Sequence, residues 1–161
     1  MRRRTLIAGA ALIGAAPLVV RAAIADSASI AERFAQTLSA HDMDAFSALF
    51  AEGYVNHQVS AAAPPPPPGV RPKAAVVAFF AARLKGLPDL KVSIQASLAA
   101  GDKEAASFLY EGTQQGPLYG VAPTGKHLSF TSCDIFRLAD GRIAEHWGMG
   151  DIAGVLAQLK G

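Results

Sequence analysis

The feature that most constrains the fold is a pair of segments near the C-terminus, residues 126–138 and 142–149, which flank Asp140-Gly141. Large apolar side chains recur at every second position in both segments, a period typical of strands with one buried face. Asp-Gly is among the preferred pairs in two-residue hairpin turns. The sequence therefore predicts an antiparallel hairpin at this end of the chain.

The rest of the chain predicts helices first and strands afterwards. Apolar residues at helical spacing predict helices over residues 27–40, 42–50, 72–85 and 152–159. Alternation predicts two more strands over 90–99 and 103–116, and a short extended segment over 54–57. Helices followed by an antiparallel meander indicate the α+β class, with a sheet of four or more strands.

A proline-rich loop is predicted over residues 61–69, where Pro64 to Pro68 are consecutive prolines. Proline has no backbone N–H to donate and favours a stiff extended conformation. This composition suits a rigid surface connector beside a pocket mouth. A docking segment for a partner protein is the alternative.

The hairpin allows a prediction of which residues share a face. If pairing runs outward from the turn without interruption, the face toward the helices carries Leu138 and Ile143, Phe136 and Glu145, Asp134 and Trp147, and Ser132 and Met149. His146 would then face away from the helices. A slip of one residue would invert this assignment, and the hydrophobic match argues against such a slip.

Carboxylates mixed with aromatic residues on this face indicate a lined cavity, because a buried carboxylate needs a partner. Asp134 and Glu145 are the acids within the hairpin, and Asp151 follows it. Each of the first two has a plainer interpretation, as a strand-end acid that is solvated or paired with an arginine. Asp151 is equally well placed to cap the last helix.

No motif for a metal or cofactor is recognisable. The histidines are scattered, and neither a phosphate-binding glycine loop, a dinucleotide fingerprint nor a Gly-x-Ser-x-Gly elbow occurs. We therefore expect no metal and no cofactor. Cys133 is the one cysteine, and we expect it to be a small buried apolar residue rather than a nucleophile.

Residues 1–25 predict an export signal. Arg2, Arg3 and Arg4 precede an apolar run over residues 6–20, and Ala23-Ile24-Ala25 offers small residues for cleavage. The arginine pair fits a twin-arginine signal, and the run is shorter than the roughly 20 residues that span a bilayer. We expect an exported, periplasmic or secreted protein with one domain over residues 26–161.

Removal of the signal changes the charge of the chain. The four arginines within it would be lost, which leaves 11 basic against 13 acidic side chains and a net charge of −2. No basic patch that would attract a phosphate backbone remains. We therefore expect no nucleic acid partner, and no membrane contact after cleavage.

Several stretches of the chain resemble one family. These are Asn56-His57, Gly112-Thr113, Gly120 to Lys126, Asp134 to Trp147, and Asp151 with Gln158-Leu159. They are similar to the SnoaL-like polyketide cyclases, or ester-cyclase-like proteins, of the cone-shaped α+β superfamily of ketosteroid isomerase and scytalone dehydratase. The resemblance implies a curved antiparallel sheet around a helix-capped conical pocket, often in a homodimer.

The resemblance also implies a chemistry and a set of site residues. Such cyclases close a polyketide ring by intramolecular aldol condensation, without metal or cofactor, and a pocket acid serves as general acid/base. Asp151 is the predicted acid/base, and His57 a positioning or proton-relay group. The substrate-binding residues would be Asp134, Trp147, Tyr54, Tyr119, Phe136 and Met149.

Three functions remain open at this stage. The first is a cofactor-independent cyclase, isomerase or dehydratase acting on a small hydrophobic carbonyl compound. The second is a non-catalytic periplasmic protein that binds a hydrophobic small molecule, with every pocket acid paired or outside. The third is a protein-interaction domain that uses the outer sheet face and the proline loop, with a filled core.

Overall fold

A computed structural model describes residues 28–58 and 65–161 of the chain. The predicted export signal lies outside the described residues, as does part of the predicted proline loop. The helices are α2 (Ile30–Ser39), α3 (Met43–Ala48), α4 (Pro72–Gly86) and α5 (Ile152–Lys160). The strands are β1 (Phe50–Asn56), β2 (Lys91–Ala100), β3 (Lys103–Thr113), β4 (His127–Ala139) and β5 (Arg142–Gly150).

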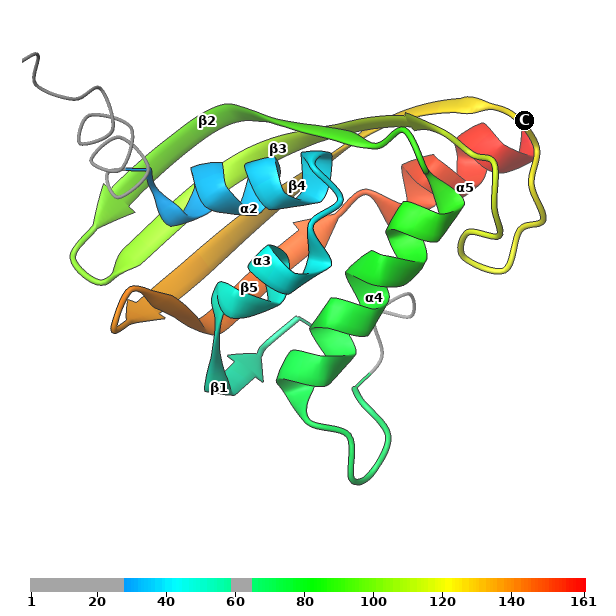
Figure 1. The fold of residues 1–161 in the computed structure, drawn as a ribbon. Coiled ribbons are helices and arrows are strands. Elements are labelled where there is room, and N and C mark those ends of the chain that lie inside the picture. Colours follow the sequence, from blue (N-terminus) through cyan, green and yellow to red (C-terminus); the bar gives the residue numbers. More distant parts are fainter. Residues whose placement is uncertain (1–27, 59–64) are drawn as a thin grey trace, which may run out of the picture.

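The strands form one curved sheet in the order β1-β5-β4-β3-β2. Figure 1 shows α2, α3 and α4 against the same side of this sheet, with α5 at the end that carries the C-terminus. The predicted α+β class is confirmed, and so are the helices over the first half of the chain and the antiparallel meander after them. The sheet and α4 together enclose the cavity that holds the candidate site.

The strand β1 is the main addition to the predicted architecture. The sequence predicts only a short extended segment over 54–57, whereas β1 begins at Phe50 and pairs with β5 in parallel. As a result α3 ends at Ala48, before the predicted end of its helix at Phe50. A parallel pair needs a long connection, so local alternation could not reveal this edge of the sheet.

The core between α2 and the sheet is built on phenylalanines. The Phe34 ring centroid lies 5.2–5.4 Å from the centroids of Phe46, Phe80, Phe108 and Phe136. Such tilted and edge-to-face contacts add to the free energy gained from burial. This cluster fills one end of the space under the helices and leaves the other end, beneath α4, for a cavity.

One buried acid has a structural role in this core. Glu104 of β3 is 5% exposed, and its carboxylate accepts hydrogen bonds from the backbone N–H groups of Ile30 and Ala31 at 3.0 and 3.3 Å. These are unpaired donors of the first turn of α2, where a negative charge is favourable. Glu104 therefore fixes α2 on the sheet.

A β-bulge in β5 sets which residues face the helices. Leu138 pairs with Ile143 as predicted, but the next pair is Arg137 with Glu145, so β5 has one extra residue, Ala144. An extra residue on one strand shifts the alternation of every residue beyond it. From Glu145 onward, β5 therefore presents the opposite face to the one predicted.

The bulge divides the face prediction into a confirmed and a wrong half. On β4, Asp134 and Phe136 lie inward as predicted, at 7% and 1% exposure. On β5, His146 is buried at 7% exposure, whereas Met149 is 78% exposed. The predicted inward orientation of Met149 and of Trp147, and the outward orientation of His146, are therefore wrong.

The outer face of the sheet has no covering layer among the described residues. Cys133 is exposed there, so the expectation that it is buried is wrong. Large apolar side chains are also exposed on this face, at Ile135 and Met149.

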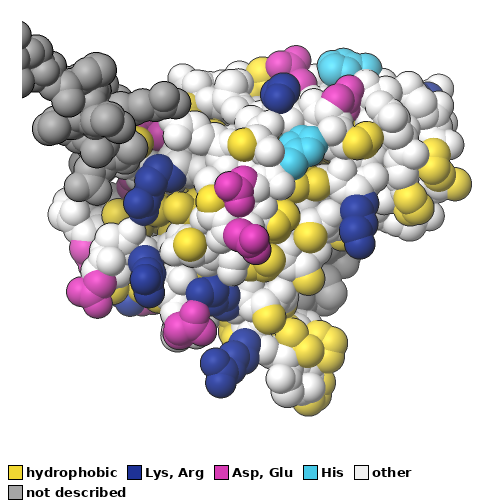
Figure 2. Space-filling model, viewed as in Figure 1, with side chains coloured by type: hydrophobic (Ala, Val, Ile, Leu, Met, Phe, Trp, Pro, Cys, Tyr) yellow, Lys and Arg dark blue, Asp and Glu magenta, His cyan; other side chains and the backbone are white. Residues whose placement is uncertain are grey.

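On the face with the helices, basic and acidic side chains are interspersed rather than gathered by sign (Figure 2). Within the described residues, no helix combines the length and the apolar character needed to cross a membrane.

Candidate active site

A cavity of about 350 Å³ lies between α4 and the inner face of the sheet. Its apolar walls come from α4 and from the loop before it, where Pro65, Pro66 and Pro67 contribute. Its polar lining includes Asn56, Arg83, Tyr110, Ser132, Asp134 and His146. An apolar hollow with a few convergent polar groups is the usual form of a small-molecule site.

The centre of the polar lining is a buried acid–histidine pair. Asp134 Oδ1 lies 2.7 Å from His146 Nε2, and Asp134 Oδ2 accepts a hydrogen bond of 2.5 Å from the Ser132 hydroxyl. Asp134 and His146 are each 7% exposed. A charge in such a place needs partners, and the two residues supply them to each other.

The second ring nitrogen of His146 faces two polar groups from β1. Its Nδ1 lies 3.2 Å from Asn56 Oδ1 and 3.3 Å from the Tyr54 hydroxyl. Burial, followed by the nearby charge of Asp134, raises the pKa of Tyr54, so this hydroxyl keeps its proton. The Tyr54 hydroxyl can donate a hydrogen bond to Nδ1 when that nitrogen carries no proton, and Nδ1–H can donate to Asn56 Oδ1 when it does. Either tautomer of the ring therefore has a hydrogen-bond partner at Nδ1.

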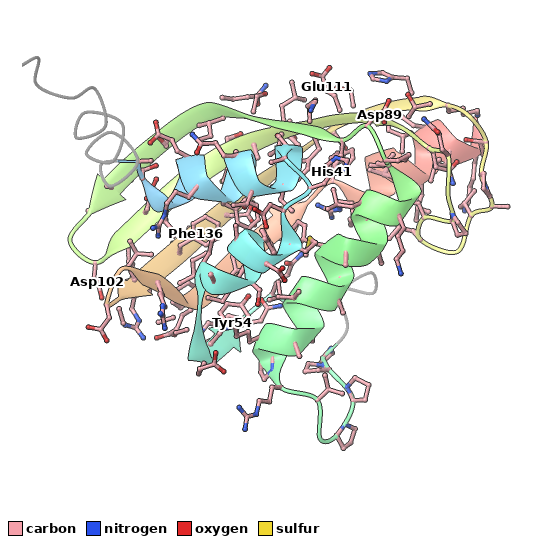
Figure 3. The ribbon with its side chains drawn as sticks, viewed as in Figure 1. His41, Tyr54, Asp89, Asp102, Glu111 and Phe136 are labelled. Carbon is pink, nitrogen blue, oxygen red and sulfur yellow. The ribbon has the colours of Figure 1, made fainter. Side chains whose placement is uncertain are left out.

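Aromatic packing against one face of the ring holds His146 in place. The Phe136 ring is stacked on His146 with centroids 5.4 Å apart. Figure 3 labels Phe136 on β4 and Tyr54 on β1, both among the side chains between the sheet and the helices. The ring orientation is thus set by residues of two strands, which favours a fixed geometry over a mobile one.

Gly148 provides the space that the pair occupies. It lies opposite Asp134 in the β4–β5 register. A Cβ at this position would lie 2.7 Å from His146 Cε1, and closer still to Asp134 Oδ1 and His146 Nε2. Any other residue would therefore force the two side chains apart. The bulge and this glycine together allow the pair to form.

The predicted substrate-binding residues are only partly brought together. Asp134 lines the cavity, while Tyr54 and Phe136 lie behind it in contact with His146. Tyr119 lies in a smaller adjoining pocket, where its hydroxyl accepts a hydrogen bond of 2.7 Å from Arg83 Nη2. Of these four residues, Asp134 alone lines the main cavity.

The remaining predicted site residues lie elsewhere. Asp151 is exposed and is the N-cap of α5, with Oδ1 accepting from the Gly154 N–H at 2.8 Å. His57 is on the outer side, stacked on Trp147 with centroids 4.5 Å apart and 2.7 Å from Glu145 Oε2. None of these residues lines the cavity, and neither does Met149. The inward orientation expected of Asp151 is wrong because its carboxylate satisfies the first turn of a helix.

Sequence reasoning missed His146, Ser132, Arg83 and Tyr110 as site residues. Ser132 was on the correct predicted face, but a serine alone carries no functional signal. His146 was excluded by the assumption of an uninterrupted register. The adjacent apolar residues Ile143 and Ala144, which interrupt strict alternation, are the sign of a bulge that the sequence offers.

No metal centre is formed by the part of the chain that the structure describes. Groups of three or more His, Cys, Asp or Glu side chains in reach of a common ion do not occur there. The acid–histidine pair is accompanied by hydroxyl and amide groups instead. This arrangement suits proton transfer and hydrogen bonding to an organic ligand.

Comparisons with known proteins agree with this architecture. The profile of the SnoaL-like polyketide cyclase family matches residues 28–159. No curated protein matches the sequence. Among solved structures, IdmH from Streptomyces antibioticus, described as a candidate polyketide cyclase, is 27% identical with a TM-score of 0.70. The alignment covers 82% of this chain and 96% of IdmH.

Two further solved structures support the fold. TsrD from Streptomyces laurentii is 24% identical with a TM-score of 0.70, and the alignment covers 86% of this chain and 96% of TsrD. A protein from Catenulispora acidiphila, described as having a ketosteroid isomerase-like fold, is 19% identical with a TM-score of 0.62. That alignment covers 81% of this chain and 92% of the other.

Proposed function

The chain belongs to the SnoaL-like polyketide cyclase family, and from this premise we propose that it is a general acid–base enzyme of the cyclase or isomerase type. Its substrate would be a small hydrophobic carbonyl compound. The observation that carries the proposal is the Asp134–His146 pair, at 2.7 Å and buried in the wall of an apolar cavity. Asp134 replaces Asp151 as the proposed acid/base.

The first step is removal of a proton from a carbon beside a carbonyl group. The Asp134 carboxylate takes the proton, and the electron pair of the broken C–H bond passes to the carbonyl as an enolate. Ser132 and His146, which hydrogen-bond the two carboxylate oxygens, fix the direction of the carboxylate. His146 is therefore proposed as a positioning residue, with Tyr54 and Asn56 as its supports.

The enolate oxygen needs a donor as its charge develops. Tyr110 lines the cavity next to Ser132, and burial, followed by the charge of Asp134, raises the pKa of its hydroxyl. The hydroxyl therefore stays protonated at neutral pH and remains available as a donor. We assign Tyr110 this stabilising role.

The second step returns the proton. In a cyclase, the enolate carbon attacks a second carbonyl of the same molecule, a C–C bond forms, and the new alkoxide takes the proton from Asp134. In an isomerase, the proton returns to a different carbon. Both outcomes leave the enzyme unchanged and need no co-reactant, and the absence of any cofactor remains a prediction.

The proposal is tested by hydrogen–deuterium exchange on 2-tetralone. This bicyclic ketone has an acidic CH₂ group between its aromatic ring and its carbonyl group. The wild-type protein in D₂O is expected to accelerate exchange over buffer, as followed by proton NMR. Asp134→Asn should lower the rate by about a hundredfold to ten-thousandfold, the usual contribution of a general base. An unchanged exchange rate in Asp134→Asn would contradict the proposal.

A binding protein is the second candidate, because both carboxylate oxygens of Asp134 are already hydrogen-bonded. In that case the wild-type protein would bind aromatic ketones without accelerating exchange. The predicted export to the periplasm, or secretion, and the homodimer stay predictions.

A further inference from the structure

The Arg83 guanidinium of α4 lies in an aromatic box. Its Cζ is 5.0, 4.9, 5.0 and 5.5 Å from the ring centroids of Phe79, Phe80, Tyr110 and Phe130. The side chain is 6% exposed, and it borders both the main cavity and a smaller pocket of about 140 Å³. Cation–π contacts make this position tolerable for a buried charge, and they hold the group in place.

The hydrogen-bonding capacity of Arg83 is largely unused. Within residues 28–58 and 65–161, its one side-chain hydrogen bond is from Nη2 to the Tyr119 hydroxyl, and Nε is buried without any partner. Nor does any carboxylate of the described residues lie within ion-pair distance of it. A guanidinium offers several N–H donors in a planar fork that matches a carboxylate.

A buried cation without an anion is costly, since both its charge and its donors are removed from water. Arg83 is the one Lys or Arg in the described lining of the main cavity. An anionic oxygen group on a ligand in the cavity would satisfy both the free donors and the uncompensated charge. The rings around the guanidinium would at the same time contact a flat apolar body.

We propose that the cavity takes planar hydrophobic molecules that carry a carboxylate, and that Arg83 binds this carboxylate. The Arg83 contact would contribute binding rather than chemistry. The site for the anion is the part of the cavity beside Arg83 of α4 and Tyr110 of β3.

Tyr110 relates this anion site to the acid–histidine pair. Its ring centroid is 5.0 Å from Arg83 Cζ. The pKa of its hydroxyl, which burial raises most, is also raised by the charge of Asp134 and lowered by a hydrogen bond with Ser132. A ligand held by its carboxylate at Arg83 would therefore direct its other end past Tyr110 toward Asp134. This orientation of the reacting carbon rests on the proposed function, whereas carboxylate binding does not.

The test compares two ligands of similar shape by isothermal titration calorimetry: naphthalene-2-carboxylate and its neutral counterpart 2-acetylnaphthalene. Wild-type protein is expected to bind the carboxylate. Arg83→Met should weaken carboxylate binding by on the order of tenfold to a hundredfold, the value of hydrogen bonds to a charged group. The same variant should change the dissociation constant of the neutral ketone by less than about threefold, because the walls of the cavity remain apolar.

Arg83→Lys is the second variant, because it keeps the charge and lacks the planar fork. It should give a carboxylate affinity between those of wild type and Arg83→Met. If circular dichroism shows that Arg83→Met does not fold, Arg83→Lys is used alone. A loss of affinity for the carboxylate that exceeds the loss of affinity for the ketone then supports the proposal. Equal losses for both ligands, an unchanged carboxylate affinity, or no carboxylate binding to wild type at millimolar concentration overturns it. Because these measurements need no turnover, their failure leaves the proton-transfer proposal intact, and failure of the exchange assay leaves this one intact.

Discussion

The sheet carries two acid–histidine pairs that differ in almost nothing but their surroundings. Asp134 and His146 on the inner face, and Glu145 and His57 on the outer face, are each separated by 2.7 Å. When the side-chain atoms alone are counted, Asp134 and His146 are 10% and 9% exposed, whereas Glu145 and His57 are 25% and 37% exposed. Distance alone would not distinguish them.

The difference lies in what else each pair contacts. The inner pair faces a cavity and is supported by neutral hydroxyl and amide groups, so a ligand in the cavity can contact it directly. Glu145 of the outer pair is also held by Arg137 Nε at 2.6 Å. That carboxylate is paired with a guanidinium and is partly exposed to solvent, which suits a surface ion pair. Burial beside a cavity is therefore the reason why the inner pair, and not the outer one, is the proposed catalytic pair.

The largest expected effect comes from replacing the two histidines in turn. His146→Gln should slow exchange on 2-tetralone by about a hundredfold or more, because a misdirected Asp134 loses its alignment with the substrate carbon. His57→Gln should leave the rate within about twofold. If the His57 variant lost as much activity as the His146 variant, the comparison between the two faces would fail.

The glycine beside the inner pair gives the next largest effect. Gly148→Ala should lower the exchange rate by about tenfold to a hundredfold, since the added Cβ would overlap Asp134 and His146 and separate them. Gly53→Ala on β1 is the matched control, because no atom lies within 4 Å of a Cβ placed there. The same rate in both alanine variants would show that the spacing of the pair is unimportant.

The helix cap offers a smaller effect, on stability alone. Asp151→Ala removes the side-chain acceptor of α5 and should lower the free energy of unfolding by about 1 kcal/mol in urea denaturation. Asp151→Asn, which retains a capping oxygen, should unfold close to wild type. Both variants should keep the wild-type exchange rate. A loss of exchange with unchanged stability would instead restore Asp151 as a catalytic candidate.

The smallest effect concerns pH and the outer pair. The hydrogen bonds from His57 and then from Arg137 lower the pKa of Glu145 below its ordinary value of 4.5. A lowered folded-state pKa gives stability that is present above about pH 4.5 and is lost as the pH falls through the lowered value. Thermal unfolding between pH 3 and pH 7 should therefore show a slightly steeper acid loss for wild type than for Glu145→Gln. Parallel curves would mean that the outer pair contributes nothing.

Much of the fold followed from local patterns in the sequence. Helical spacing and alternation depend on neighbouring residues, so the helices, the Asp140-Gly141 hairpin and the inner face of β4 were predicted correctly. The parallel pairing of β1 with β5 was not, because the two strands are far apart in the chain and nothing local to either reports the other.

The site was harder to predict because it depends on one inserted residue. Ala144 reverses the remainder of β5, so Trp147 and His146 exchange faces relative to an uninterrupted strand. Asp134, on the regular strand, was correctly expected at the pocket. Asp151 had two equally good interpretations, and the structure shows the helix cap. Arg83 looked like an ordinary helix residue, since its aromatic neighbours come from three separate elements.

The most direct measurement of the central claim is a double-mutant cycle across the inner pair, read as exchange rates on 2-tetralone. If Asp134 and His146 act as one unit, the double variant with Asp134→Asn and His146→Gln should be no slower than Asp134→Asn alone. Losses that simply multiply, with each variant contributing its own factor independently, would show that the buried pair is not a catalytic unit.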